Sequence, residues 1–312
     1  MEIRIGEEED IPQIISLLKI SLGEALTPKS IDLWKWKHLN NPFGPSPILI
    51  AVEKTRIIGV RVFLRWEFLV NGNVVKACRA VDTAIDPAYQ GKGIFSKLTL
   101  SLIDKIKKEG IDFIYNSPNN DSMPGYVKMG WQKWGKLPLK LEFHLKAGKN
   151  KHPLQPENWI KIEKLIQKIE QSNATQNYPK TNLKQGFLKW RYHECPLFPY
   201  YFLSDEENYV LFYRIKESRL GRELRVTDLF ILNQLENETK LQLQRSLSKV
   251  QRLCGARFTS FSGTQYPDQK AIYLGSLPIL KAGPLLTIRK VKEEFHPMKV
   301  DWKWSLGDLE VF

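Results

Sequence analysis

The order of apolar and polar positions predicts alternating strands and helices. Short apolar runs bounded by turn residues predict strands, whereas apolar positions three or four residues apart predict helices. The predicted strands are Glu2–Ile5, Pro47–Glu53, Arg56–Trp66, Val74–Ile85 and Ile111–Asn116, with two more near Lys133–Leu145. The predicted helices are Glu8–Leu18, Pro28–His38, Phe95–Glu109, Met123–Met129 and, after a polar linker over Lys146–Pro156, Glu157–Gln171. This order indicates an α/β (α+β) fold, in which a mixed central sheet is flanked by helices.

The second half of the chain repeats the first. Leu33–His38 matches Phe187–Tyr192, with a separation of 190 − 36 = 154 residues between the tryptophans. Arg79–Ile85 matches Arg225–Ile231 at an offset of 228 − 82 = 146. Matches in the same order at nearly constant offsets predict a tandem duplication. We therefore expect two domains of one fold, residues 1–147 and 157–289, and a C-terminal tail over residues 290–312.

The first candidate for chemistry is a glycine turn between a predicted strand and a predicted helix. Gln90-Gly91-Lys92-Gly93 follows the strand Val74–Ile85 and precedes the helix that starts near Phe95. Such a turn presents backbone N–H groups at a helix N-terminus, where a phosphate can be held without a metal. The glycines also let a ligand approach the backbone closely. The turn therefore predicts a phosphate-containing ligand.

With the segment Tyr126–Trp131, this turn resembles the GCN5-related N-acetyltransferase (GNAT) family. In that family a Gln/Arg-x-x-Gly-x-Gly/Ala turn binds the pyrophosphate of acetyl-CoA, and the tyrosine of a Tyr-x-Lys-x-Gly-aromatic segment protonates the departing thiolate. The resemblance covers about the first half of the chain, and it departs from the family at Phe95, where a small residue is usual. It implies that acetyl-CoA is the co-substrate and that it contacts Ala84, Ile85, Gln90, Gly91, Lys92, Gly93, Ile94, Phe95, Ser96 and Asn119.

The second copy lacks the features that bind phosphate. Where the first copy has Asp86–Gly93, the second has Leu232–Thr239, which contains no glycine and has carboxylates at Glu236 and Glu238. Glycine loss hinders close approach, and the carboxylates repel an anion. We expect this degenerate copy not to bind CoA, but to brace the first domain and to build one wall of the acceptor cleft.

Three acid or base groups, together with one backbone N–H, are candidates for catalysis. By the resemblance, Tyr126 is the general acid, and a backbone N–H near Ala84 and Ile85 stabilises the oxyanion. Asp82 is a candidate base, although the matching Asp228 in the degenerate copy favours a structural role. The third candidate is a carboxylate of the tail, that of Asp308, Glu310 or Phe312, which would serve the acceptor amine. The chain also resembles tandem-repeat enhanced-intracellular-survival acetyltransferases, whose chain-terminal carboxylate takes part in catalysis. A tail that packs on the outside of the sheet is the alternative.

Composition limits the other possibilities. The 312 residues are 42% hydrophobic and 26% charged, which is typical of globular proteins. The three cysteines and five histidines show no metal-ligand spacing, so no metal is expected. With no apolar stretch of membrane-spanning length and no signal peptide, we expect a cytoplasmic protein without a membrane partner. The net charge of +13 suits an anionic partner, but the lysines are scattered, which favours a solvated surface over nucleic-acid binding.

Together these features predict an N-acetyltransferase. It would move an acetyl group directly from acetyl-CoA to a primary amine of an amino-sugar, an aminoglycoside-like compound, a polyamine or a protein. Two alternatives stay open: a Fem-like aminoacyl transferase that uses aminoacyl-tRNA, and a non-catalytic CoA-binding or scaffold protein. The sequence does not choose among the acceptors, nor does it predict an oligomeric state.

Overall fold

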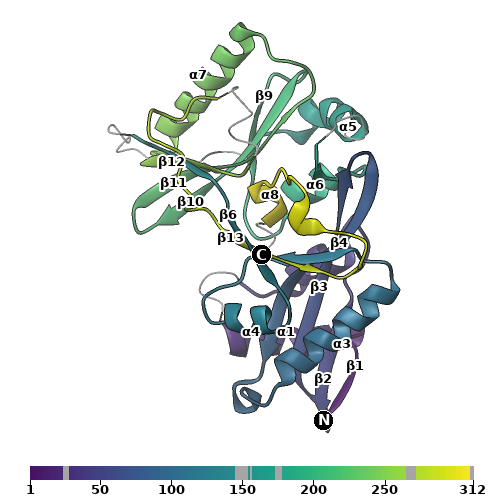
Figure 1. Cartoon of the computed structure of the whole chain (residues 1–312). Coiled ribbons are helices and arrows are strands. Elements are labelled where there is room, and N and C mark those ends of the chain that lie inside the picture. Colours follow the sequence, from purple (N-terminus) through teal and green to yellow (C-terminus); the bar gives the residue numbers. More distant parts are fainter. Residues whose placement is uncertain (24–27, 145–153, 155–156, 173–177, 265–271, 310–312) are drawn as a thin grey trace. The chain divides into compact units, whose positions relative to one another are not determined.

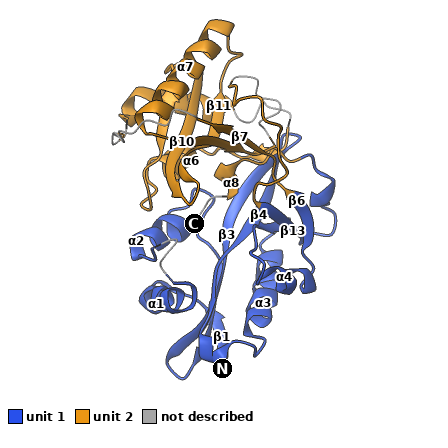
Figure 2. Cartoon of the chain, turned by 90° about the vertical axis from the view of Figure 1, so that its left-hand side faces the viewer, with its two compact units in different colours: residues 1–135, 285–301, 312 blue, residues 136–284, 302–311 orange. Residues whose placement is uncertain are grey.

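The chain forms two compact units, each of which contains a β-sheet and helices. The computed structural model describes residues 1–23, 28–144, 154, 157–172, 178–264 and 272–309. Unit 1 comprises Met1–Gly135 and Leu285–Asp301, and unit 2 comprises Lys136–Pro284 and Trp302–Val311 (Figures 1 and 2). The predicted mixed α/β class is confirmed. In the described part of the chain, no helix combines the length and apolarity that a membrane span requires.

Unit 1 is built on a mixed sheet. Its strands are β1 (Glu2–Ile5), β2 (Ile48–Glu53), β3 (Arg56–Val70), β4 (Asn73–Ile85), β5 (Phe113–Asn116), β6 (Gln132–Lys136) and β13 (Leu285–Lys290). Their order across the sheet is β1-β2-β3-β4-β5-β13-β6. β4 and β5 are parallel, whereas β3 pairs with β4 and β13 pairs with β5 in antiparallel fashion. The long β3–β4 hairpin turns at Asn71-Gly72, as its sequence predicts.

Helices cover both faces of this sheet (Figure 2). They are α1 (Ile11–Leu22), α2 (Ile31–Trp34), α3 (Ile94–Lys108) and α4 (Met123–Lys128), with 3₁₀ turns at Glu8–Asp10, Pro87–Tyr89 and Pro297–Lys299 and a π-helical turn at Lys35–Leu39. One core contains Ile14 and Trp34 of the first two helices together with Val62 of β3. The opposite core contains Phe63 of β3 and Leu102 of α3. Apolar residues that alternate along β3 thus fill both cores, since successive side chains point to opposite faces.

Unit 2 has a smaller mixed sheet. Its strands are β7 (Leu139–Phe143), β9 (Tyr201–Ser204), β10 (Tyr209–Ser218), β11 (Gly221–Ile231) and β12 (Phe258–Ser262), in the order β7-β12-β11-β10-β9. The unit also contains the short β8 (Lys180–Thr181), the 3₁₀ turn Trp159–Ile162 and the helices α5 (Glu163–Ser172), α6 (Phe187–Tyr192), α7 (Asn237–Leu253) and α8 (Leu306–Leu309). Leu243 and Leu247 of α7 pack with Leu211 and Leu224 of the sheet in one core.

Neither unit is continuous in sequence, which differs from the expected ranges 1–147 and 157–289. β7 lies within the first expected range but pairs with β12 in the sheet of unit 2. β13 lies at the end of the second expected range but pairs with β5 in the sheet of unit 1. A strand's hydrophobic pattern indicates that it will pair, but it does not identify the partner, because any strand of suitable length can satisfy the same backbone groups.

Candidate functional site

The site in unit 1 begins where β4 and β5 cease to pair. Their parallel register runs from Ala77 opposite Phe113 to Arg79 opposite Tyr115. Beyond it lies a cavity of about 620 Å³, which is within the usual range for a small-molecule site. The cavity is lined by Ala80–Ile85 of β4 and by Asn116–Asn119, with contributions from Ser21, Leu22, Gln90, Phe95, Asp121, Ser122, Gly125 and Tyr126. The sheet itself therefore opens into a wedge that can receive an extended ligand.

A β-bulge shapes the β4 wall of this wedge. Val60 pairs with Ala84 and Val62 pairs with Val81, so Arg61 of β3 lies opposite two residues of β4. One of them, Asp82, has a positive φ of 40°, which is uncommon for a non-glycine residue. Bulges of this kind occur next to active sites, where they re-aim side chains. Here the carboxylate of Asp82 contacts Lys37 of the π-helical turn, whereas the hydroxyl of Thr83 contacts Arg61.

Asp82 is held by two basic residues of the π-helical turn. Its Oδ2 lies 2.5 Å from Nζ of Lys37 and 2.9 Å from Nε2 of His38, whose Nδ1 lies 3.0 Å from Oγ of Ser46. Lys37 and His38 are almost completely buried. Burial alone would raise the pKa of Asp82, but Lys37 and His38 outweigh it and hold this pKa well below its usual value. A carboxylate held ionised in this way is a weak proton acceptor.

The glycine turn has the backbone conformation that its sequence predicts. Gly91 and Gly93 both have φ of 75°, and a Cβ added at either would meet nothing within 4 Å. The glycines are therefore required by the backbone conformation, and the space beside them is open to a ligand. Gly93 caps α3, whose first turn presents backbone N–H groups. Lys92 adds a cation, with Nζ 4.6 Å from the centre of the Tyr89 ring.

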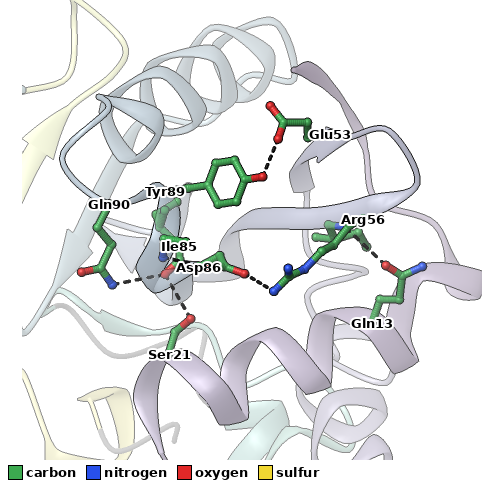
Figure 3. Close-up of polar contacts among 10 residues, drawn as sticks. Gln13, Ser21, Glu53, Arg56, Ile85, Asp86, Tyr89 and Gln90 are labelled. Atoms are coloured by element: carbon green, nitrogen blue, oxygen red, sulfur yellow. Dashed lines mark hydrogen bonds and ion pairs between the residues drawn. The ribbon is translucent and has the colours of Figure 1, made fainter.

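Contacts to neighbouring elements fix the turn in place (Figure 3). Asp86 accepts a hydrogen bond from the Ala88 N–H at 3.0 Å and pairs with Arg56 at the start of β3. The Tyr89 hydroxyl donates to Glu53 at the end of β2. These contacts hold the turn against the sheet before any ligand arrives, which reduces the cost of ordering it on binding.

Hydrogen bonds also fix the end of β4 (Figure 3). The carbonyl oxygen of Ile85 accepts hydrogen bonds from Oγ of Ser21 at 3.1 Å and from Nε2 of Gln90 at 3.2 Å. The next N–H, that of Asp86, donates back across the sheet to Ile58 of β3. Because successive N–H groups of a strand point to opposite sides, the Ile85 N–H is directed away from β3, to the side of the wedge.

Tyr126 lines the cavity from α4. Its side chain is buried among apolar groups, with ring centres 5.5 Å from Phe95 and 5.0 Å from Trp131. Phe95, where the family usually has a small residue, fits because Gly125 has no side chain: a Cβ there would lie 3.0 Å from the Phe95 ring. The Tyr126 hydroxyl accepts a hydrogen bond from Nη1 of Arg61 at 2.9 Å. Arg61 is fully buried.

A family model described as an acetyltransferase (GNAT) domain matches residues 2–134. These residues are a GNAT domain. A glucosamine 6-phosphate N-acetyltransferase from Trypanosoma brucei brucei is 25% identical over 134 residues, which are 42% of this chain and 89% of the relative. The family model and this relative confirm the family resemblance that the glycine turn and the Tyr126 segment predict.

Solved structures resemble a larger part of the chain. A GCN5-related N-acetyltransferase from Anabaena variabilis has a TM-score of 0.62 and 13% identity, and the alignment covers 93% of this chain and 73% of that protein. Eis1 from Mycobacterium abscessus has a TM-score of 0.55 and 13% identity, with the same coverage of both chains. At this identity the likeness shows the fold alone, and it extends beyond the GNAT domain into unit 2.

The GNAT domain gathers most of the sequence-predicted residues around one cavity. Those that line it are Asp82, Ala84, Ile85, Gln90, Phe95, Asn119 and Tyr126, while Gly91, Lys92, Gly93, Ile94 and Ser96 form the adjoining turn and the start of α3. The Oδ1 atom of Asn119 accepts from the N–H and the hydroxyl of Ser122, so this side chain also holds the residue that precedes α4. Of the tail carboxylates that are candidates for catalysis, those of Glu310 and Phe312 lie outside the described residues.

Arg61 is a site residue that the sequence analysis missed. The available signal is a lone charge between apolar neighbours, Val60 and Val62, in a strand whose flanks are buried. Lys37 and His38 were missed as partners of Asp82 for another reason. They belong to the repeated tryptophan segment, but only the bulge in β4 directs Asp82 toward them.

In unit 2 the place that the repeat matches to the cavity holds the chain's own C-terminal segment. β11 and β12 pair in parallel up to Val226 and Phe261, and beyond them Ser305 forms a bridge with Gly263. A Cβ at Gly307 would lie 1.9 Å from Oδ2 of Asp228, the residue matched to Asp82. The segment Trp302–Leu309 therefore packs tightly into this part of unit 2.

The carboxylate of Asp308, one of the tail's candidates for catalysis, is buried within unit 2. Asp308 accepts from the Ser305 N–H at 2.8 Å and from the Thr181 hydroxyl, and burial raises its pKa. Burial and the nearby charge of Asp308 raise the pKa of Asp228 to about 7. Tyr192 donates its hydroxyl to Asp228, in the position where His38 contacts Asp82. Both units thus use an aspartate at the β-bulge to fix a helix on the sheet.

Proposed function

We propose that unit 1 transfers an acetyl group from acetyl-CoA directly to a primary amine. The observation that carries this proposal is the wedge between β4 and β5, which has the glycine turn at one end and Tyr126 in its wall. Phosphate-binding backbone, a channel for an extended chain and a phenolic hydroxyl follow one another along a single cavity. That order is the order of the parts of acetyl-CoA, from pyrophosphate to thioester.

The donor is held at the turn. The first N–H groups of α3, which follow the two glycines, have no partner within the helix, and the helix dipole favours an anion there. Lys92 adds positive charge beside it. The pantetheine arm then runs beside Ala84 and Ile85, along the edge of β4 that β5 leaves unpaired.

Transfer itself needs few groups. A neutral amine attacks the thioester carbonyl, and the Ile85 N–H, directed to the wedge, stabilises the oxyanion. The C–S bond then breaks, and Tyr126 protonates the departing thiolate. We assign Asp82 a positioning role rather than the role of base, because Lys37 and His38 hold it ionised. The proton that the nitrogen loses is carried by water in the open cavity and replaces the one that Tyr126 gives up.

The acceptor is an amine-bearing small molecule or protein side chain. The relative from Trypanosoma brucei brucei acetylates an amino sugar phosphate, as its name states, and this makes amino sugars the first acceptors to test. Unit 2 does not bind CoA in this proposal. Glu236 and Glu238 stand where the glycine turn would be, and Trp302–Leu309 occupies the place matched to the wedge.

Calorimetry with acetyl-CoA tests the donor site. The wild-type protein is compared with Gly91→Leu/Gly93→Leu, and the matched control is Gly72→Leu/Gly110→Leu. Gly72 and Gly110 have φ of 76° and 78° and equally open surroundings, but they lie in turns away from the cavity. Both double variants carry the same backbone strain, on the order of 1–2 kcal/mol per residue, so only a binding role separates them.

We expect saturable binding at one site per chain in the wild type and in the control, and loss of binding in the turn variant. Release of free thiol with a panel of amino sugars, polyamines and peptides then tests turnover. No binding by the wild type would refute the donor assignment and favour the aminoacyl-tRNA alternative. Binding without turnover over the whole panel would favour the non-catalytic role.

A further inference from the structure

A buried cation lies beneath the wedge. Arg61 is fully buried in β3, and no described carboxylate lies within ion-pair distance of its guanidinium. Its Nε and Nη2 atoms have no hydrogen-bond partner among the described residues. Burying a charge without a counter-ion costs several kcal/mol, about as much as a folded domain gains from a few well-packed side chains. Such a cost calls for a compensating function.

Arg61 contacts three rings and two hydroxyl groups. Its Cζ lies 4.7 Å from the centre of Phe63, 5.3 Å from that of Tyr126 and 5.6 Å from that of Phe95, so cation–π attraction offsets part of the burial cost. Nη1 donates to the Tyr126 hydroxyl at 2.9 Å and to Oγ1 of Thr83. Both residues, Tyr126 and Thr83, line the cavity.

The direction of these hydrogen bonds matters. A guanidinium has only donors, so the Tyr126 oxygen accepts from Arg61 and its own hydrogen stays available to a group in the cavity. The ring of Tyr126 packs against Phe95 and Trp131, and Tyr126 is one of the residues that line the cavity. Arg61 therefore determines which way the Tyr126 O–H points and places a positive charge behind its oxygen.

We propose that Arg61 is the positioning residue of the general acid: it orients the Tyr126 O–H toward the thioester sulfur and compensates the charge left on the phenolic oxygen. The inference rests on the proposed function of this site. When the C–S bond breaks, its electron pair goes to sulfur, and the phenolic proton moves to that sulfur to give free CoA thiol. The phenolate is then paired with Arg61, and it recovers the proton that the acetylated nitrogen loses, carried by water.

The experiment compares Arg61→Met, Tyr126→Phe and the double variant with wild type. Arg65→Met is the matched control, because Arg65 lies on the same strand but pairs with Glu109 at 2.5 Å, away from the cavity. For each protein, kcat is measured by thiol release, acetyl-CoA affinity by calorimetry and the melting temperature by fluorescence. The affinity and stability readouts identify a merely structural role, which would weaken both.

We expect Arg61→Met to lower kcat by about 100-fold, the scale of general acid catalysis, with acetyl-CoA affinity changed by less than about threefold. The double variant should be no slower than Tyr126→Phe, because Arg61 acts through Tyr126. Arg61→Lys should recover part of the rate, since it restores the charge but not the guanidinium geometry. The control should keep the wild-type kcat.

Three results would overturn the proposal. Full activity of Arg61→Met would do so directly. Multiplicative losses in the double variant would show that Arg61 acts independently of Tyr126, and equal losses of rate, affinity and melting temperature would show a packing role. If the wild type binds CoA but acetylates no amine, the role of Arg61 is tested by the ultraviolet absorbance of the bound CoA thiolate. This absorbance should appear at lower pH in wild type than in Arg61→Met. A wild type that binds no CoA would refute the proposed function itself.

Discussion

Replacing Asp82 by asparagine separates a structural role of this residue from a catalytic one. The ammonium group of Lys37 is 2.5 Å from the Asp82 carboxylate, and the Lys37 side chain is only 2% exposed. Removal of one partner of a buried ion pair costs about 3–5 kcal/mol, because the other charge stays buried. Asparagine retains the shape and tolerates the positive φ of 40° at this position, so no backbone strain is added. We therefore expect the variant to lose about 3–5 kcal/mol of the free energy of unfolding.

Urea unfolding followed by tryptophan fluorescence measures this loss. The double variant Lys37→Met/Asp82→Asn removes both charges and should recover most of it, since an apolar side chain of similar length then fills the space. His38 keeps an acceptor in the asparagine carbonyl, which makes the double variant a clean comparison. Asp82→Asn that is as stable as wild type but loses kcat would refute the structural reasoning and restore Asp82 as the base.

The same variant predicts a pH dependence. The pKa of Asp82 is depressed in the folded protein, so its ionised form is stabilised relative to the unfolded chain, where an aspartate has a pKa of about 3.9. The contribution is present above that value and is lost as the pH falls through and below it. The stability difference between wild type and Asp82→Asn should therefore shrink on acidification below about pH 4. A difference that stays constant down to strongly acid pH would contradict the ion-pair account.

Three further outcomes follow from packing and charge. Gly125→Ala should lower kcat, because its Cβ would lie 3.0 Å from the Phe95 ring next to Tyr126. In a protein that also carries Phe95→Ala, the same change should stabilise α4, and thermal melting measures this effect. The folded-state pKa of Asp228 is raised to about 7, so the protonated form is favoured below that pH. The wild type should therefore lose at most ~4 kcal/mol of its free energy of unfolding as the pH rises from about 4 to about 7, and Asp228→Asn should not show this loss. Gly307→Ala should destabilise unit 2 by about 1–3 kcal/mol in urea unfolding, without changing acetyl-CoA binding.

Local patterns predict the elements of unit 1 closely. The strand at Val74–Ile85, the glycine turn and the helix near Phe95 agree with β4 and α3 to within one residue. The helix expected at Pro28–His38 is different: it is a short α2 followed by a π-helical turn that ends at Leu39. That turn brings Lys37 and His38 to Asp82, a contact that depends on packing against a bulge and has no signature in the helical period.

The candidate site is predictable where the backbone carries the chemistry and unpredictable where a side chain depends on a distant partner. The positive φ of Gly91 and Gly93 can be predicted from the residue type alone. Arg61, in contrast, is a charge in an apolar strand, and its partner Tyr126 lies 65 positions further along the chain. The paired strands β5 and β13 are separated by even more residues along the chain. The hydrophobic periodicity therefore cannot predict that both units are discontinuous in sequence.

The two units share an arrangement of two separating strands, which borders a cavity in unit 1 and a packed protein segment in unit 2. In each, a parallel strand pair separates after a few residues, and an aspartate at a bulge fixes a helix on the sheet. Such a separation leaves backbone polar groups of the inner strand without a neighbouring strand, and these groups need a partner. In unit 2 the segment Trp302–Leu309 lies there, with Arg191 donating to the Gly307 carbonyl at 3.0 Å. In unit 1 a cavity of about 620 Å³ lies there instead, and in the proposed function the extended arm of acetyl-CoA fills it.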